Sequence, residues 1–598
     1  MEKQPLRSEI PVASTWNLTD IFQGNEAWEK DFSKLSNLLT QIGGFEGHLG
    51  ESETLYQCLT MVDEINLLAE RLYSYAHLSH HTDLGNSDAQ ALVNRVDIMI
   101  VDVREKLSFI DPELLSLPEE KLSSLTGAKG LAFYRFSLEK KLRLKPHTRS
   151  KQEEEIIART GMLAQLSENA FSMLNDADMV FPGIQDEKNN AIELTHGTYG
   201  KCLESREPRL RKDAFHAYHG AYRSHQHTIT SLFNGNIQKD LFYSRTLRYP
   251  SSLAMALFDD NIPSQVYENL LTTVHDHLPV FHRYLNMRKK ILGVDELHLY
   301  DLSVPLVPEV SMSLPFEETR ALVQKGLAPL GDEYRDIVRT AFDNRWIDVF
   351  ESKGKHSGGY SWGIFGAHPY ILLNYVGTLN DIFTVAHELG HAVHSYLSNR
   401  FQAYHYAAYS IFIAEIASTL NEALLLHHLL ETSPDPKRQL YFLSHFADNF
   451  RATVIVQTMF AEFEKIVHEM AEEGIPLTLE KLNEVYYTLC EQYYGREVAL
   501  DRDAEISWMR IPHFYSSFYV YKYATGFSAA QFLADRIIGG DRNALQGYHE
   551  LLRSGGKDYP LVLLQKAGVD MSKPAPVELD WKMFGSAIDK MEKLLRMP

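Results

Sequence analysis

The sequence predicts a mainly α-helical fold with a small β-sheet. Between Glu26 and Phe171 an apolar residue recurs every three or four positions, as in LYQCLTMVDEINLLAERLYSYAHL, which is typical of amphipathic helices. The same periodicity resumes after Leu203 and again through the last third of the chain. At 598 residues the chain exceeds one ordinary hydrophobic core, so we expect several packed layers or two to three lobes.

A short strand interrupts the helical pattern. The segment SGGYSWGIFGAHPYILLNYVGTLND combines five glycines with PYILLNYV, an aromatic and β-branched run. Because the run opens with Pro369, which has no backbone N–H, we expect a strand at the edge of a sheet. An exposed edge could bind an extended peptide through its main chain. In the helix that follows, we expect Asn380 or Asp381 to be the cap.

A change of composition marks a boundary between two regions. The segment NDADMVFPGIQDEKNN is rich in Asp and Asn and contains a Pro-Gly pair, which is typical of a connection rather than of a helix. We therefore predict an amino-terminal helical lobe at residues 1–190 and a second region at residues 191–598 that contains the motif described below.

Charge and composition exclude several classes of partner. The net charge is −20 and Lys and Arg do not cluster, so we expect no nucleic-acid partner. The chain starts without an apolar leader, and no uncharged apolar run reaches the roughly 18 residues that span a bilayer. We therefore expect a cytoplasmic protein with no membrane partner. The three cysteines are widely separated, so any metal must use His and carboxylate ligands.

The helix FTVAHELGHAVHSYL carries a His-Glu-x-x-His motif. Because residues four apart lie on one helical face, His387 and His391 can present their imidazoles to one zinc ion. Glu388 lies one step round the helix, beside the metal and its water. Small Ala386 and Gly390 would let a neighbouring backbone approach this helix closely.

A catalytic zinc usually has three protein ligands, so a third ligand is needed. The longer motif His-Glu-x-x-His-x-x-Gly-x-x-His is excluded, because positions 394 and 397 hold His and Leu. The next acidic residue is Glu415, 24 residues after His391, in the helix FIAEIASTLNE. We choose Glu415 as the third ligand, and Glu422, two turns on, could hydrogen-bond a ligand imidazole.

Other histidines compete less well for this role. His394 lies one turn beyond His391 and is expected to pack locally, and His405 lies in an aromatic loop. The histidines of HAYHGAYRSHQH, residues 216–227, have no accompanying carboxylate and are expected at the solvated surface.

Three blocks resemble the oligoendopeptidase F family, within the wider thimet-oligopeptidase group of zinc peptidases. They are HPYILLNYVGTLNDIFTVAHELGHAVHS, EIASTLNE and RIPHFYSSFYVYKYATG. The start, TWNLTDIF, also resembles that family, so the similarity covers nearly the whole chain. It implies a helical, two-lobed enclosure around a deep channel that cuts peptides of limited length, with residues 191–598 contributing to both lobes.

The resemblance also implies the roles of individual residues. His387, His391 and Glu415 would bind one Zn²⁺ per chain, with Glu388 as the general base. A His and a Tyr of the carboxy-terminal block would bind the substrate and the oxyanion. Here these are His513 and one of three tyrosines, with Tyr521 as first choice and Tyr515 and Tyr519 as further substrate contacts.

Residue chemistry agrees with this assignment. Hydrolysis of an amide builds negative charge on the carbonyl oxygen, and a Tyr hydroxyl or a His N–H in a dry cleft stabilises it better than water does. Near the strand, Gly358, Gly359 and Tyr360 could form a mobile loop over the cleft, although an ordinary turn is an equal alternative. We also expect His368 to contact the substrate.

The sequence therefore predicts a zinc endopeptidase that hydrolyses internal bonds of short peptides. A carboxypeptidase with the same ligands is an alternative, whereas the Gly-x-Met-Glu-Asn segment usual in aminopeptidases of this chemistry is missing from the sequence. A non-catalytic helical peptide-binding protein with a structural zinc is a further alternative. It is disfavoured because a structural site needs a fourth protein ligand, and the sequence offers no obvious one.

Overall fold

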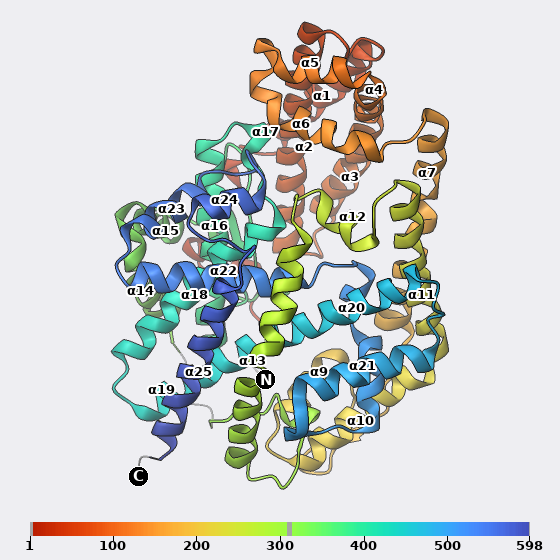
Figure 1. Cartoon of the computed structure of the whole chain (residues 1–598). Helices are drawn as coiled ribbons and strands as arrows, with labels where there is room; N and C mark the ends of the chain where they lie inside the picture. The colour runs from red at the N-terminus through yellow and green to blue at the C-terminus, as the bar shows by residue number, and fades with distance from the viewer. Residues whose placement is uncertain (1–3, 308–313, 597–598) are drawn as a thin grey trace. The chain divides into compact units, whose positions relative to one another are not determined.

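The computed structural model describes residues 4–307 and 314–596 of the chain. Helices dominate and the strands are short (Figure 1), so the predicted mainly α-helical fold is confirmed. The chain forms two compact units, each made of three separate stretches. Unit 1 comprises Met1–Glu154, Ser311–His428 and Leu533–Val569; unit 2 comprises Glu155–Val310, Leu429–Phe532 and Asp570–Pro598.

The chain passes between the units more than once. Residues 191–598, expected as one region contributing to both lobes, supply stretches of both units. The first passage lies at residues 154 and 155, within helix α7 (Lys151–Ala164), whereas the boundary predicted from the sequence lies at residue 190. Helices α18 (Ile411–Thr432) and α22 (Tyr521–Ile538) also continue from one unit into the other.

Unit 1 contains the amino-terminal helices, the helices around the motif and a three-stranded sheet. Its helices are α1 (Asn25–Gln41), α2 (Ser52–Thr82), α3 (Ser87–Leu107), α4 (Ile110–Ser116), α5 (Glu119–Gly127), α6 (Arg135–Leu144), α14 (Phe316–Gly326), α15 (Gly331–Asp343), α16 (Leu379–Phe401), α17 (Tyr404–Ala407), α23 (Arg542–Leu552) and α24 (Pro560–Lys566). Its strands are β4 (Ile347–Asp348), β5 (Tyr360–Trp362) and β6 (Tyr370–Leu372).

One hydrophobic cluster of unit 1 reaches from the amino-terminal helices to this sheet. It includes Trp28 of α1, Leu72 of α2 and Val96 of α3, together with Tyr370 and Leu372 of β6. The indole N–H of Trp28 donates to the carbonyl of Leu72 at 3.1 Å, so the one polar atom of this buried ring is satisfied. Burial of this surface fixes the sheet against α1 to α3.

The strand predicted at a sheet edge is the central strand instead. β6 pairs in parallel with β4 and antiparallel with β5, so the order is β4-β6-β5. Pro369 lies just before β6, where its missing N–H leaves the ladder intact. The edge prediction is therefore wrong, because a two-residue partner such as β4 is too short to produce a periodic signal in the sequence.

The helix with the motif forms as predicted, but with a different cap. The side chain of Thr378 accepts a hydrogen bond from the N–H of Asp381 at 3.2 Å, and the carboxylate of Asp381 accepts from the N–H of Thr378 at 2.9 Å. This capping box starts α16 at Leu379. Asp381 therefore supports the cap from the third helical position, and Asn380 is not the cap.

Unit 2 consists of packed helices with two small two-stranded sheets. Its helices are α8 (Leu166–Met173), α9 (His196–Glu204), α10 (Pro208–Ser224), α11 (Gln226–Thr246), α12 (Ser252–Phe258), α13 (Ser264–Leu292), α19 (Pro436–Phe450), α20 (Val456–Glu472), α21 (Leu479–Tyr494) and α25 (Ala575–Leu595). β1 (Ile184–Gln185) pairs with β2 (Ala191–Ile192), and β3 (Leu297–His298) pairs with β7 (Val498–Ala499). Within the described ranges, no helix is long and apolar enough to cross a membrane.

Candidate metal centre and active site

Three side chains of unit 1 converge on one point. α16 presents His387 and His391 one turn apart, and their Nε2 atoms lie 3.2 Å from each other. The Oε2 atom of Glu415, from α18, lies 3.5 Å from each of these nitrogens. Among the described residues, this is the only group of three or more His, Cys, Asp or Glu side chains spaced to hold a metal ion.

The spacing fits a zinc ion. Ligand atoms at about 2.0–2.1 Å in a tetrahedral zinc site lie about 3.4 Å from one another. The three observed separations, 3.2, 3.5 and 3.5 Å, match that value. Two imidazole nitrogens and one carboxylate oxygen are also donors that zinc accepts. The structure thus brings together the three residues that the sequence predicted as ligands.

Glu422 orients the first imidazole. The Nδ1 atom of His387 lies 2.5 Å from Oε1 of Glu422, which lies two helical turns after Glu415 on α18. With Nδ1–H donating to the Glu422 carboxylate, Nε2 keeps its lone pair for a metal. The predicted hydrogen bond between Glu422 and a ligand imidazole is confirmed.

A close approach of two helices brings Glu415 to the motif. A Cβ atom on Gly390 would lie 2.5 Å from the carbonyl oxygen of Ala417 and 2.6 Å from Cα of Ser418. Only glycine fits here, as the sequence analysis expected from the small residues of this helix. The hydroxyl of Ser418 donates to Glu415 Oε2 at 3.2 Å, which holds the carboxylate in place.

Two buried polar residues that the sequence analysis missed also join these helices. Asn421 donates from Nδ2 to the carbonyl of Ala386 at 2.9 Å, and the Tyr334 hydroxyl donates to Oδ1 of Asn421 at 2.8 Å. Asn421 is fully buried. An asparagine inside the apolar run IASTLNEALLL was the available signal, because a buried amide needs partners.

Glu388 points beside the three converging atoms and is only 7% exposed. Burial raises the pKa of its carboxyl, while the neighbouring His387 and His391 act in the opposite direction. A Cβ atom on Gly359 would lie 3.9 Å from Oε1 of Glu388, so the predicted glycine segment lies against this carboxyl. Gly358 has φ of +84°, a conformation that favours glycine.

Two other predicted substrate contacts have protein partners. The Tyr360 hydroxyl lies 2.6 Å from Nδ1 of His81. The ring of His368 stacks on Trp346 at 5.1 Å, and its two nitrogens lie 2.7 Å from the Pro369 carbonyl and 3.1 Å from a carboxylate oxygen of Asp20. These contacts explain the position of His368 without a substrate.

The two competing histidines have local partners, as expected. The ring of His394 stacks on Tyr409 at 3.6 Å, and burial lowers the pKa of His394 to about 3, so this ring is neutral. His405 lies between Ser137, at 2.6 Å, and Asp63, at 3.0 Å. Neither histidine belongs to the group His387, His391 and Glu415, which we call the metal-spaced group.

The carboxy-terminal block lies in unit 2, and its residues differ in exposure. His513, exposed, has its Nε2 atom 3.4 Å from the hydroxyl of Tyr523, and its ring stacks near Tyr519. Tyr521, the first choice for the oxyanion, is only 1% exposed and packs against Tyr267 at 5.1 Å.

Tyr515 is also buried, at 4% exposure, with its ring stacked on Phe171 at 4.3 Å. Burial therefore argues against both Tyr515 and Tyr521 as substrate contacts. Tyr519 and Tyr523 are the more accessible tyrosines beside His513, and Tyr523 was not among the tyrosines predicted from the sequence.

Comparison with known families and proteins agrees with this site. Residues 202–582 match Peptidase family M3, and residues 113–181 match Oligopeptidase F. The chain is 43% identical to oligopeptidase PepF of Bacillus subtilis (strain 168), over 99% of this chain and 88% of that protein. It is 37% identical to group B oligopeptidase PepB of Streptococcus agalactiae serotype III (strain NEM316), over 98% of each chain.

A solved structure shows the same similarity. The crystal structure of oligoendopeptidase-F from Enterococcus faecium superposes with a TM-score of 0.75 at 34% identity, over 96% of this chain and 99% of that chain. The matches extend through both units and include the motif helix. The chain therefore belongs to peptidase family M3 and is a metalloendopeptidase of the oligoendopeptidase F group.

Proposed function

We propose that this metallopeptidase is a zinc-dependent endopeptidase that hydrolyses internal bonds of short oligopeptides. Its family accounts for the hydrolysis of oligopeptides and for a metal ion. The observation that carries the finer proposal is the convergence of His387, His391 and Glu415 at 3.2–3.5 Å, with the buried Glu388 beside them.

His387, His391 and Glu415 would hold one zinc ion. When bound, zinc supplies Lewis acidity and lowers the pKa of a water molecule to near neutrality. Glu422 fixes the ring of His387 through the 2.5 Å contact to Nδ1, so the ligand face of the imidazole is oriented before a metal arrives. Three protein ligands leave room for water and substrate, as a catalytic site requires.

Glu388 is the proposed general base. Its carboxylate would take a proton from the attacking water and later return that proton to the leaving amine. The nearly complete burial of Glu388 excludes bulk water from the carboxylate, and burial raises its pKa. Both effects make a carboxylate a stronger base than it is in solution.

His513 is proposed to stabilise the oxyanion, together with Tyr519 or Tyr523. An N–H and a hydroxyl aimed at the carbonyl oxygen stabilise the negative charge that develops there. The support is the group formed by exposed His513 and half-buried Tyr519 and Tyr523, in which the Tyr523 hydroxyl lies 3.4 Å from Nε2 of His513.

An edge strand next to Glu388 suits a peptide substrate. β5 is at the edge of the sheet, and Gly359 directly precedes it. We propose that the main chain of the substrate pairs with β5, which would allow many side-chain sequences. Gly359 lets a peptide approach, since an added Cβ would lie against Thr384 and Glu388. His368 is not included among the proposed contacts.

Product mapping separates this proposal from its alternatives. The test is an internally quenched short peptide blocked at both ends, compared with the same peptide with free ends. Internal cleavage of the blocked peptide is the expected result. Cleavage only next to a free carboxyl end would identify a carboxypeptidase. A zinc-loaded chain that cuts neither peptide would be a binding protein, although the metal-spaced group has no fourth member among the described residues.

A further inference from the structure

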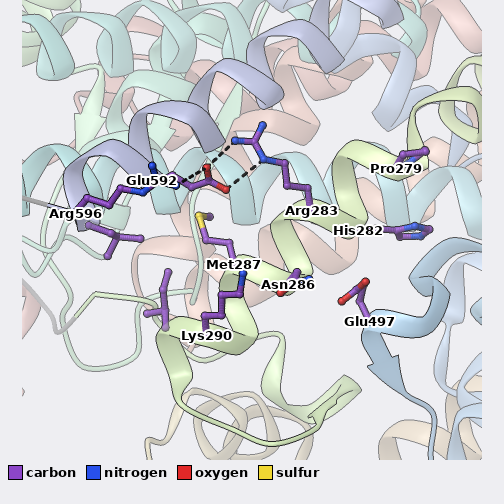
Figure 2. Close-up of a pocket in the computed structure, with 11 residues that line it drawn as sticks. Pro279, His282, Arg283, Asn286, Met287, Lys290, Glu497, Glu592 and Arg596 are labelled. Atoms are coloured by element: carbon purple, nitrogen blue, oxygen red, sulfur yellow. Dashed lines mark hydrogen bonds and ion pairs between the residues drawn. The ribbon is translucent and has the colours of Figure 1, made fainter.

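Two pockets of unit 2 differ in how their charges are balanced. The larger, about 700 Å³, lies between α13 and α25 (Figure 2). In it Arg283 donates to Glu592 at 2.8 Å, and Glu497 also lines the pocket. Basic and acidic side chains both line this pocket, so its charges are balanced without a ligand.

The second pocket is a cavity of about 370 Å³ whose permanently charged side chains are the two arginines Arg451 and Arg510. Unit 2 supplies its whole lining, whereas the metal-spaced group lies in unit 1. Its polar lining consists of His196, Tyr199, Tyr218, His219, Ser303, Arg451, Tyr486, Cys490, Tyr494, Ser507 and Arg510. No Asp or Glu of the described chain is among the residues that line it.

Arg510 is the main charge in the cavity. It lies at the end of the 3₁₀ segment Arg502–Arg510, and none of the carboxylates of the described chain lines the cavity beside it. Its Nε atom is buried without a hydrogen-bond partner. Since arginine stays protonated in proteins, the cavity contains an enclosed and uncompensated positive charge.

Arg451 adds a second, weakly compensated charge. The nearest carboxylate oxygen, Oδ1 of Asp448, lies 4.0 Å from its Nε atom. That same oxygen accepts hydrogen bonds from Tyr284 at 2.8 Å and from Arg288 at 3.0 Å. Asp448 is therefore shared between Arg451 and Arg288. The positive charge of the two cavity arginines is thus larger than the negative charge near them.

Three tyrosines offer hydroxyl groups beside these arginines. Tyr199, Tyr486 and Tyr494 line the cavity and are at most 9% exposed. Burial raises the pKa of all three, so each keeps its proton and can donate it. Such donors complement an acceptor with several lone pairs.

Two further titratable groups of the cavity, His219 and Cys490, are neutral. His219 was expected at the surface but is 1% exposed, and its nitrogens contact the Phe215 carbonyl at 2.9 Å and the Ser507 hydroxyl at 3.0 Å. Burial and the charge of Arg510 lower the pKa of His219 to about 3. Burial raises the pKa of Cys490 to about 12, so it remains a thiol.

We propose that this cavity binds a small oxyanion, a carboxylate or a phosphate, between Arg510, Arg451 and the hydroxyls of Tyr199, Tyr486 and Tyr494. A guanidinium fork matches two oxygens of such a group, and charge-assisted hydrogen bonds are the strongest available to it. A ligand of this kind removes the cost of an unpaired buried cation. A cavity of this volume has room for a small organic anion.

Calorimetric titration of the dialysed, zinc-loaded full chain tests the proposal. The probes are inorganic phosphate and acetate in separate titrations, with chloride at equal ionic strength. The variants are Arg510→Gln and Tyr199→Phe, with Arg502→Gln as control because the Arg502 side chain is 86% exposed. Tyr199→Phe retains both arginines and the ring, so it reports on the site even if Arg510→Gln folds poorly.

Saturable binding of phosphate or acetate is expected. The titration that shows it identifies whether the oxyanion is a phosphate or a carboxylate. Arg510→Gln should weaken this component at least about tenfold, Tyr199→Phe should weaken it several-fold, and Arg502→Gln should leave it unchanged. Binding of phosphate at the metal site would persist in all three variants. It is thereby distinguished from binding in the cavity, which the two cavity variants weaken. Binding of neither oxyanion, equal binding of chloride, or full retention in both cavity variants would overturn the proposal.

Discussion

The Nδ1 atom of His387 lies 2.5 Å from the Oε1 atom of Glu422. A carboxylate in this position fixes the tautomer of the imidazole and makes its Nε2 atom a better metal ligand. We predict that Glu422→Gln lowers zinc affinity by about 10- to 100-fold without removing a ligand. Competition with a chromogenic chelator measures this change. Glu431→Gln, at an exposed position of the same helix, is the control, and equal affinity in both variants would contradict the role of Glu422.

Substitution of Glu388 separates metal binding from turnover. Glu388→Gln keeps the size of the side chain and removes the proton acceptor, while the three converging atoms of the metal site are untouched. We expect wild-type zinc content and a fall in kcat of at least about 10² to 10⁴-fold, the range for general acid–base catalysis. Metal analysis and steady-state kinetics on one sample measure both. Wild-type kcat in this variant would show that the base has been assigned to the wrong residue.

The contact between α16 and α18 has no space for a side chain at Gly390. A methyl group there would meet the backbone of Ala417 and Ser418 at 2.5–2.6 Å, and backbone cannot move aside as a flexible side chain can. Gly390→Ala should therefore destabilise unit 1 by about 1–3 kcal/mol or more and weaken zinc binding, because Glu415 moves with α18.

Gly220→Ala is the matched control for this substitution. Gly220 is an exposed helical glycine of α10 with no atom within 4 Å of an added Cβ, so alanine there should stabilise the chain by up to about 1 kcal/mol. Thermal unfolding compares the two variants. A Gly390→Ala chain as stable and as zinc-replete as Gly220→Ala would mean that the helices are not in close contact.

A buried ion pair at the three-stranded sheet makes stability depend on pH. Asp348 of β4 contacts Arg7 and lies 2.8 Å from Nζ of Lys355, and both side chains of the latter pair are fully buried. Burial opposes ionisation of Asp348, but the hydrogen bond from Arg7 and the charge of Lys355 outweigh it and lower its pKa below 3.8. The unfolded chain thus binds this proton more readily than the folded chain does.

Stability from Asp348 is therefore present above pH about 4 and is lost as the pH falls through the depressed folded pKa. Asp348→Asn should cost about 3–5 kcal/mol near neutral pH, because it leaves Lys355 buried without a counter-charge, and it should flatten the acid limb. Asp111→Asn, in an exposed pair with Lys141, should change little. Urea midpoints from pH 3 to 7 measure this; identical profiles for the two variants would contradict the prediction.

The tyrosines of the carboxy-terminal block should differ in their effect on kcat. His513→Ala and Tyr523→Phe should each lower kcat by about 10² to 10³-fold if they bind the oxyanion, with smaller changes in KM. Tyr521→Phe should leave kcat near wild type, because Tyr521 is 1% exposed and packs on Tyr267. A loss in Tyr521→Phe with full activity in Tyr523→Phe would reverse the assignment, and Tyr519→Phe would then be the remaining comparison.

Short-range spacing explains which parts of the site could be predicted. His387 and His391 share a helical face whatever the rest of the chain does, and the first acidic residue that a following helix offers is Glu415. The helix packing could also be anticipated, because Gly390 removes the side chain that would keep a neighbour away. These features depend on local geometry, which the sequence specifies.

Features that depend on distant partners were predicted less well. β6 became a central strand because β4, a strand of two residues, pairs with it from a region that has no alternating pattern. The exposure of each tyrosine in HFYSSFYVYKY could not be predicted, because the chain turns at Phe518, with φ of +59°, and α22 begins only at Tyr521. His219 is buried beside Ser507 of the 3₁₀ segment Arg502–Arg510, which is distant from it in sequence.

Zinc titration of the chelator-stripped chain tests the central claim most directly. Cleavage of an end-blocked, internally quenched peptide is followed as zinc is added back in substoichiometric steps. The three-ligand site predicts no internal cleavage without metal, and activity that rises linearly and stops at one zinc per chain. Full internal cleavage by the stripped chain, or one bound zinc per chain with no recovery of cleavage, would contradict a catalytic zinc held by His387, His391 and Glu415.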